Sequence, residues 1–207
     1  MNQSRVASWS LLVLILLSAL FVRSYHLGTI PSGLYPDEAV NAVDALHAIE
    51  TGHYQLFYPN NYGREGLFIN LQALALRTFG YTIAALKLWS VIFGTLTVLG
   101  TYLLGRELFH RRGAALFSAF FVATSYWAIN FSRIGFRAIM TSFLLSFAFY
   151  FFFKGLRTRR SIDFAFSGLC IGLGLHTYIA FRLTPLILVI LLPFLMLAYE
   201  DFLKPLS

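Results

Sequence analysis

Two adjacent carboxylates, Asp37 and Glu38, are the residues of this chain whose types and spacing best suit chemistry. They stand in the longest polar interval of a very apolar sequence, directly after Pro36. An aspartate before a helical pattern is also a good N-cap, worth about 1 kcal/mol, and a glutamate in the first turn suits the helix dipole. Capping and catalysis are therefore both open for Asp37. They are compatible, because a cap holds the carboxylate in place.

The composition is that of an integral membrane protein. Of the 207 residues, 58% are hydrophobic and 12% are charged, and the mean hydropathy is +0.70, which excludes an ordinary soluble domain. The net charge of +7 comes without a long basic run, so we expect no nucleic-acid partner and contacts with anionic lipid instead. With Cys170 as its one cysteine, the chain has neither an intrachain disulfide nor a cysteine-based metal cluster.

Hydrophobic runs predict an all-α fold, a single transmembrane domain over 1–207 with about six spanning helices. We predict an uncleaved first span from Trp9 to Val22, and further spans at about 83–104, 114–131, 138–153, 161–179 and 183–199. Residues 28–82 form an outer loop. Its two amphipathic patterns, 37–51 and 64–79, predict two helices that lie in the membrane interface.

The first of these interfacial helices has two distinct rows of side chains. Its apolar stripe consists of Ala39, Ala42, Val43, Leu46 and Ile49, while Glu38, Asn41, Asp44, His47 and Glu50 face elsewhere. Gly52 is the predicted stop of the helix.

Basic residues orient the spans. With a cytoplasmic N-terminus, the positive-inside rule is met by a set of seven: Arg106, Arg111, Arg112, Lys154, Arg157, Arg159 and Arg160. The Asp37–Glu38 pair is then extracytoplasmic. The outer side still carries Arg64, Arg133, Arg137 and Arg182. Each alone suits an interfacial anchor, but together they suit a phosphate at the membrane surface, because the planar guanidinium pairs with phosphate oxygens.

Histidines give little support for a metal site. No histidine or carboxylate follows His53 or His176 by three or four residues, so we predict no metal ligands there. His176 suits a hydrogen-bonded structural role, although its outer position keeps it among the site candidates. No cofactor is predicted, and a divalent cation at the carboxylate pair is left open.

Several segments, taken in order, resemble one family. They are Pro-x-Gly-Leu-x-Pro-Asp-Glu-Ala at 31–39, Gly-Arg-Glu-Gly-Leu-Phe at 63–68, Gly-Arg-Glu-Leu-Phe at 105–109 and Phe-Ser-Arg-Ile-Gly-Phe-Arg at 131–137. This order resembles the polytopic C-type glycosyltransferases of the dolichyl-phosphate-mannose protein mannosyltransferase and aminoarabinose transferase type, which are similar to glycosyltransferase family 39. The outer-loop Asp-Glu pair is the most specific part of the resemblance.

The resemblance implies a glycosyltransferase that moves sugar from a polyprenyl-phosphate lipid to an acceptor hydroxyl on the outer face of the plasma (inner) membrane. The family's outer-loop aspartate, the base, matches Asp37. One base suffices for an inverting displacement, because a phosphate leaving group needs cations rather than a general acid. Glu38 is then a supporting or metal-contacting acid. The substrate-binding candidates are Arg64, Glu65, Arg133, Arg137, His176, Tyr178 and Arg182. The sugar and the acceptor stay open.

Two departures from the family pattern matter. Residues 132–137 lack the further acid that some members carry, and members usually continue for several more spans, so we expect this chain to be an N-terminal portion. A transporter or flippase for a lipid-linked substrate and a non-catalytic, truncated remnant that binds polyprenyl lipid are the alternatives. The acids cluster in the outer interval, whereas proton-coupled transporters place a carboxylate at mid-span, which favours the transferase.

Overall fold

Nearly every element of the chain is helical. The computed structural model describes residues 3–198. In chain order its elements are α1 (Gln3–Ser24), α2 (Pro36–Thr51), β1 (Phe57–Tyr58), β2 (Arg64–Glu65), α3 (Gly66–Phe79), α4 (Ile83–Phe109), α5 (Arg112–Thr124), α6 (Tyr126–Arg133), α7 (Ala138–Thr158), α8 (Ser161–Gly174), the 3₁₀ helix η1 (Ile179–Leu183) and α9 (Thr184–Ala198). The predicted all-α class is confirmed.

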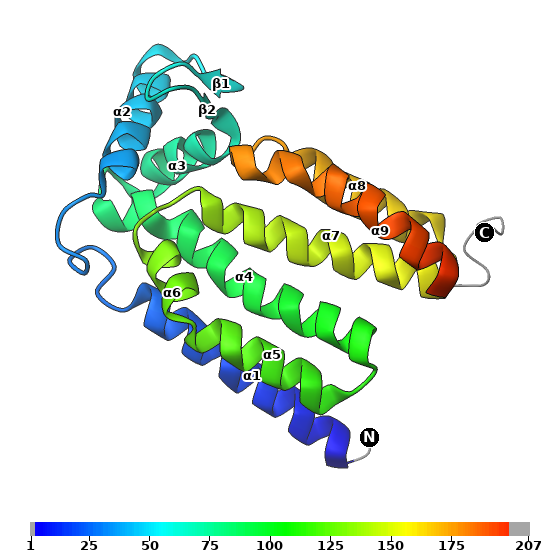
Figure 1. Cartoon of the computed structure of the whole chain (residues 1–207). Helices are drawn as coiled ribbons and strands as arrows, with labels where there is room; N and C mark the ends of the chain where they lie inside the picture. Colours follow the sequence, from blue (N-terminus) through cyan, green and yellow to red (C-terminus); the bar gives the residue numbers. More distant parts are fainter. Residues whose placement is uncertain (1–2, 199–207) are drawn as a thin grey trace.

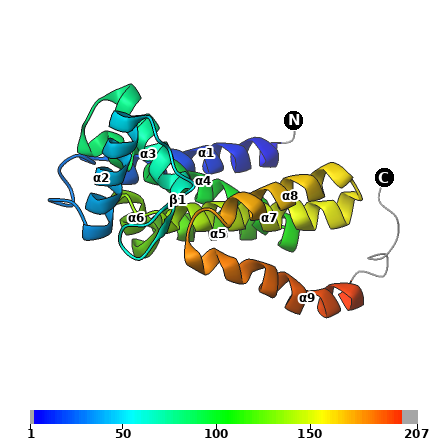
Figure 2. The same ribbon diagram turned by 90° about the horizontal axis from the view of Figure 1, so that it is seen from above.

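The long helices run side by side, with α4 at their centre (Figure 1). Helix α4 contacts α1, α3, α5, α6 and α7. Helices α2 and α3 and the antiparallel β1–β2 pair cover one end of the bundle, which we call the cap end. Seen from above, α1 and α9 flank α4 and α7 on opposite sides (Figure 2). The opposite end, where α4 and α7 finish and α5 begins, carries the seven cytoplasmic candidates and is called the basic end.

Within the described residues, four helices are long and apolar enough to cross a membrane: Val6–Ser24, Ile83–Phe109, Ala138–Thr158 and Ile179–Leu197. The predicted span 161–179 is shorter in the structure, because α8 has 14 residues, about 21 Å against a hydrocarbon core of about 30 Å. The helix ends at Gly174, where a Cβ would lie 1.9 Å from the ring of Phe181. The last residue of the predicted span 183–199 lies outside the described residues.

The predicted span 114–131 is bent rather than continuous. Helices α5 and α6 meet at 52° and count as a fifth span only if the bent pair crosses as one. Ser125 between them has extended dihedral angles, φ −60° and ψ 123°. The hydroxyl of Thr124 donates to the Phe120 carbonyl at 2.9 Å, a back-bond of the kind that accompanies helix bends.

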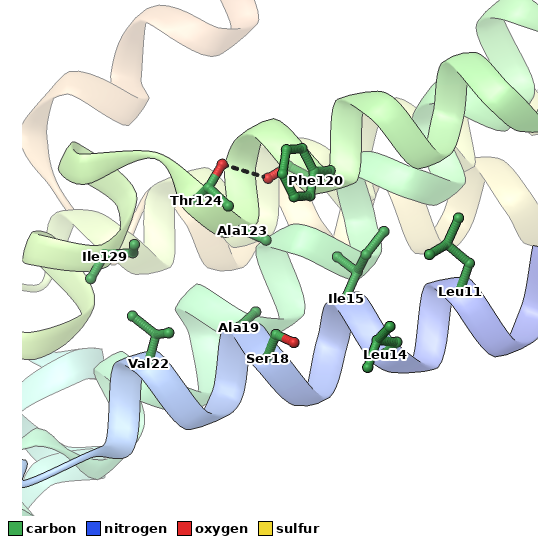
Figure 3. A pocket seen from close by; sticks show the side chains of 10 residues that line it. All are labelled: Leu11, Leu14, Ile15, Ser18, Ala19, Val22, Phe120, Ala123, Thr124 and Ile129. Atoms are coloured by element: carbon green, nitrogen blue, oxygen red, sulfur yellow. Dashed lines mark hydrogen bonds between the residues drawn. The ribbon is translucent and has the colours of Figure 1, made fainter.

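An apolar cavity of about 320 Å³ lies beside this bend, between α1 and the α5–α6 pair (Figure 3). Aliphatic side chains such as Leu14 and Ile15 line it, with the hydroxyls of Ser18 and Thr124. None of its lining residues carries a charge. The cavity therefore offers no group for carboxylate chemistry.

Helix α2 buries the first part of its polar row together with Ala45 and Ala48. Glu38, Asn41 and Asp44 are buried, whereas Val43 and Leu46 of the apolar stripe are 62% and 36% exposed. Buried polar groups are costly without partners, so the row needs donors and cations from neighbouring elements. The outward apolar side chains suit a helix that faces the membrane interface.

Candidate active site

Asp37 is not the helix N-cap that the sequence suggested. Helix α2 begins one residue earlier, with Tyr35 as N-cap and Pro36 as its first residue, a position that suits the fixed φ of proline. The Glu38 Oε2 atom accepts a hydrogen bond from the backbone N–H of Tyr35 at 3.3 Å. Glu38 therefore performs the capping expected of Asp37, and the Asp37 carboxylate is left for another role.

The Asp37 carboxylate stays close to the surface. Its side chain is half-buried, and its Oδ1 atom accepts a hydrogen bond from the Asn61 side-chain amide at 2.8 Å. Asn61 lies in the turn between β1 and β2 with a left-handed φ of 51°, a conformation that asparagine tolerates better than most residues. The turn thus reaches back to the start of α2 and orients its first carboxylate.

The Glu38 side chain points into the protein instead. It is 1% exposed, and its Oε1 atom lies 3.8 Å from Nζ of Lys87, which is fully buried in α4. Neither atom has a hydrogen-bond partner among the described residues. Gly135 closes over the carboxylate with a φ of +64°, and a Cβ there would lie 2.5 Å from Oε1. Burial raises the pKa of Glu38 to about 7, although the Lys87 charge acts in the opposite direction.

Arg64 forms a second buried ion pair beside the first. Its Nε donates to the Asn60 carbonyl at 3.2 Å, and its terminal nitrogens donate to Asn41 Oδ1 and Asp44 Oδ2. The Asn60 amide donates to the other oxygen of Asp44 at 2.8 Å. With no exposed surface, Arg64 holds α2 against the β1–β2 turn. We call Glu38, Asp44, Arg64 and Lys87 the buried ion-pair layer.

Arg133 is likewise occupied by the protein itself. Its two terminal nitrogens donate to four backbone carbonyls at 2.6–3.2 Å. These acceptors belong to Val22, Arg23, Tyr25 and Ile30, around the end of α1. A helix end leaves such carbonyls without intrahelical partners, so Arg133 ties α6 to the end of α1.

Arg137 is placed quite differently. It is half-buried at the start of α7, with its guanidinium carbon 5.3 Å from the centre of the Tyr178 ring. Within residues 3–198 its Nε has no hydrogen-bond partner. Burial lowers the pKa of Arg137, while the nearby carboxylates of Glu65 and Asp37 act to raise it. The two carboxylates and this cation therefore act on one another at the cap end.

Glu65 and Arg182 complete the arrangement. A terminal nitrogen of Arg182 donates to Glu65 Oε1 at 3.1 Å, with the arginine side chain 57% exposed and the glutamate 7% exposed. Such a half-exposed pair contributes little to stability. It does place the remaining N–H groups of Arg182 at the surface, next to the start of α3. We call Asp37, Glu65, Arg137, Tyr178 and Arg182 the open cluster.

An aromatic row lies along this cluster. The Phe136 ring lies between Tyr35 and Tyr178, with centroid distances of 6.3 and 5.9 Å. His176 does not join it, because its side chain is exposed and makes no hydrogen bond or ion pair with a described residue. Across residues 3–198, no group of three or more His, Cys, Asp or Glu side chains is arranged to hold a metal ion.

Lys87 is the main residue that the sequence did not single out. It stands five residues into α4, in the apolar run Ala-Leu-Lys-Leu-Trp, where a lysine ordinarily extends to the interface. Its signal was simply a cation inside a predicted span, which usually faces a partner. Asn61, the hydrogen-bond partner of Asp37, carried no sequence signal beyond its turn-rich neighbourhood.

The comparison with known families matches the chain downstream of the carboxylate pair. The family model described as dolichyl-phosphate-mannose-protein mannosyltransferase matches residues 67–205, more than half of the chain. The matched segment contains Arg133, Arg137 and Arg182 and begins after Asp37 and Glu38. A comparison with curated proteins finds no match.

Proposed function

Because the chain belongs to the dolichyl-phosphate-mannose-protein mannosyltransferase family of membrane glycosyltransferases, we propose that it transfers sugar from a polyprenyl-phosphate donor to an acceptor hydroxyl at its cap end. The open cluster is the proposed active site. Asp37 is the base, and Arg137 and Arg182 bind the donor phosphate.

The observation that carries this proposal is the convergence of Asp37 and Arg137 from distant parts of the chain. A base and a phosphate-binding cation must face one substrate from two sides. Tyr35, two residues before Asp37, and Phe136, the neighbour of Arg137, pack with their ring centroids 6.3 Å apart, and the Asp37 charge acts to raise the pKa of Arg137. The Arg137 Nε atom is buried and has no hydrogen-bond partner within the described residues. Phosphate oxygens are the acceptors that a guanidinium fork matches best.

The chemistry needs few groups. The acceptor oxygen attacks the anomeric carbon as Asp37 takes its proton. The bond between that carbon and the phosphate oxygen breaks, its electron pair leaves with the polyprenyl phosphate, and the single displacement inverts the sugar. Base catalysis of this kind contributes about 10²–10⁴-fold, and cations stabilise the charge on the leaving group. Glycoside hydrolases need a second carboxylate because their leaving group is an alcohol.

The other site candidates take supporting roles in this proposal. Glu65 orients Arg182 through their 3.1 Å contact, and the Tyr178 ring supports the guanidinium of Arg137. Glu38 positions Asp37 through the start of α2, and Arg64 and Arg133 hold the surrounding elements together. His176 stays a substrate-binding prediction without a contact to the cluster.

The proposed reaction face is extracytoplasmic in the plasma (inner) membrane, with the N-terminus cytoplasmic. The support is the separation of charge in the fold, because the basic end lies opposite the cap end and the positive-inside rule assigns basic ends to the cytoplasm.

The test is sugar transfer by the purified protein in liposomes that contain a radiolabelled polyprenyl-phosphate sugar. We expect donor consumption that depends on the protein, and a product with the inverted anomeric configuration by NMR. Peptide, lipid and glycan acceptors are compared in parallel. Movement of intact donor between leaflets without cleavage would support the flippase alternative, and saturable donor binding without cleavage would support a non-catalytic binder. A product with retained configuration would contradict the single displacement.

A further inference from the structure

A polar pocket lies at the basic end of the bundle, far from the open cluster. Its volume is about 440 Å³, and three helices contribute to it: Trp9 comes from α1, Arg106 from α4 and Arg157 from α7. The start of α1 and the ends of α4 and α7 all lie at that end (Figure 1). The proposed sugar transfer makes no use of this pocket.

Arg106 is the cation of this pocket that lacks a counter-ion. A terminal nitrogen donates to the buried hydroxyl of Tyr102 at 3.4 Å. Its Nε atom is buried with no hydrogen-bond partner, and Arg106 makes no salt bridge, within residues 3–198. A buried donor left unpaired is costly, so the pocket is suited to a ligand that brings an acceptor oxygen.

The carboxylate in the pocket lining is already engaged. Both oxygens of Glu107 accept from Arg157, one of them at 3.1 Å from its terminal nitrogen. The Glu107 side chain is 10% exposed and that of Arg157 is 52% exposed. Two arginines therefore face one carboxylate, and His110 in the lining adds a further positive charge when protonated. The lining has an excess of positive charge.

We infer that this pocket binds the phosphate headgroup of an anionic phospholipid. The guanidinium of Arg106 matches phosphate oxygens. Trp9, which is 53% exposed and lies 6.3 Å from the Tyr102 ring, is an aromatic of the kind found at headgroup depth. Leu103 gives the lining an apolar flank, which favours a lipid with acyl chains over a free phosphate. The basic end would meet anionic lipid in the leaflet opposite the proposed reaction.

Native mass spectrometry of the purified chain tests this assignment. The detergent-solubilised protein is titrated with phosphatidylglycerol, and with phosphatidylcholine for comparison. We expect one phosphatidylglycerol to be retained in preference. Arg106→Gln should weaken its binding about tenfold, the effect of losing a hydrogen bond to a charged group. Arg111→Gln is the matched control, because it removes an exposed charge at the same end outside the pocket lining and should leave binding unchanged.

Arg157→Gln is a second variant at a more exposed position, where folding is less at risk. It leaves the Glu107 carboxylate unpaired in the pocket, so phosphatidylglycerol binding should weaken at least as much. Equal binding by wild type and both pocket variants would overturn the site. The alternative outcome is that inorganic phosphate at millimolar concentration protects wild type, but not Arg106→Gln, against thermal unfolding. If phosphatidylglycerol were then not retained in preference, the ligand of the pocket would be free phosphate and the lipid assignment would be overturned. Sugar transfer is not part of this readout, so the proposal stands or fails separately from Asp37.

Discussion

The buried ion-pair layer and the open cluster are built from the same residue types, and they lie side by side at the cap end. In the layer, Arg64 has no exposed surface and its nitrogens donate to three acceptors. In the cluster, Arg137 rests on a tyrosine ring and its Nε has no partner within the described chain. Asp37 and Glu38 are neighbours in sequence, yet each belongs to a different region.

This difference shows that the exposure of a charged group, rather than its residue type, separates structural charges from chemical ones. Successive residues of a helix point about 100° apart, so Glu38 turns inward to Lys87 while Asp37 stays near the surface. A charge enclosed by the protein, as Arg64, Glu38 and Lys87 are, holds the fold. A charge near the surface, as Asp37, Arg137 and Arg182 are, is available to a substrate. Substitutions in the two regions should separate these two kinds of charge, with the largest change in free energy at Arg64.

Removing Arg64 should damage the fold more than any other arginine substitution at the cap end. Arg64→Met leaves Asp44 and Asn41 buried without their main donor, and breaking a buried pair in this way costs about 3–5 kcal/mol. Thermal unfolding in detergent measures the loss. Arg77→Met, an exposed arginine of the adjacent helix α3, is the control and should unfold like wild type. Equal unfolding temperatures for the two variants would show that Arg64 does not stabilise the buried ion-pair layer.

Glu38 should make stability depend on pH. Its pKa in the folded protein is about 7, above the ordinary value of 4.5, so the folded state binds its proton more tightly than the unfolded state. The stabilisation is complete below about pH 4.5 and is lost as pH rises to about 7, a change of about 3 kcal/mol.

Unfolding of wild type and Glu38→Gln at several pH values between 4.5 and 7.5 tests this slope. In Glu38→Gln, the free energy of unfolding should no longer show the decline with rising pH that Glu38 causes. Glu50→Gln removes an exposed carboxylate at the other end of α2 and should keep it. A wild-type decline that survives in Glu38→Gln would show that another group titrates.

Substitutions of Arg137 and Arg133 should have opposite effects on donor affinity and on stability. Arg137→Gln removes a proposed ligand of the donor phosphate, so donor affinity should fall about 10–100-fold while stability changes little. Arg133→Gln removes donors to four carbonyls, so stability should fall while the folded fraction binds donor normally. Donor titration together with unfolding separates the two. The same pattern in both variants would abolish the distinction between occupied and available arginines.

Substitution of Tyr178 should have the smallest effect on donor affinity. Tyr178→Leu removes the ring beneath Arg137, and a partly exposed cation–π contact is worth about 0.5–1 kcal/mol. Donor affinity should therefore fall about 2–5-fold, and Tyr178→Phe, which keeps the ring, should restore most of it. Tyr81→Leu, at an exposed tyrosine before α4, is the control for a general loss of aromatic surface. A full loss in Tyr178→Phe would assign the effect to the hydroxyl.

The sequence predicted the two helices of the cap end well because their boundaries carry local signals, whereas the β1–β2 pair was not predicted. Pro36, Gly52 and Gly80 stop or start the helices, and the observed bounds of α2 and α3 differ from the predicted ones by at most two residues. The side of α2 that is buried was not predictable in this way. The first part of its polar row, Glu38 to Asp44, turns inward because Arg64 and Lys87 supply charges, and both come from other elements.

The same dependence on packing explains why the roles of the outer arginines could not be predicted from the sequence. The sequence places four of them together as outer cations, but the acceptors that occupy Arg64 and Arg133 belong to α2, to the turn before β2 and to the end of α1. Such contacts depend on how segments pack, and no spacing in the sequence records them. The bend at Ser125 was missed for a related reason, since hydropathy is continuous across it while the backbone is not.

The most direct test of the account is the rate of sugar transfer by Asp37→Asn at saturating donor, measured with its unfolding temperature. Asparagine keeps an oxygen that accepts from Asn61 and removes the base. We predict an unchanged unfolding temperature and a rate about 10²–10⁴-fold lower than that of wild type. A folded Asp37→Asn protein that transfers sugar at the wild-type rate would contradict the assignment of Asp37 as the base.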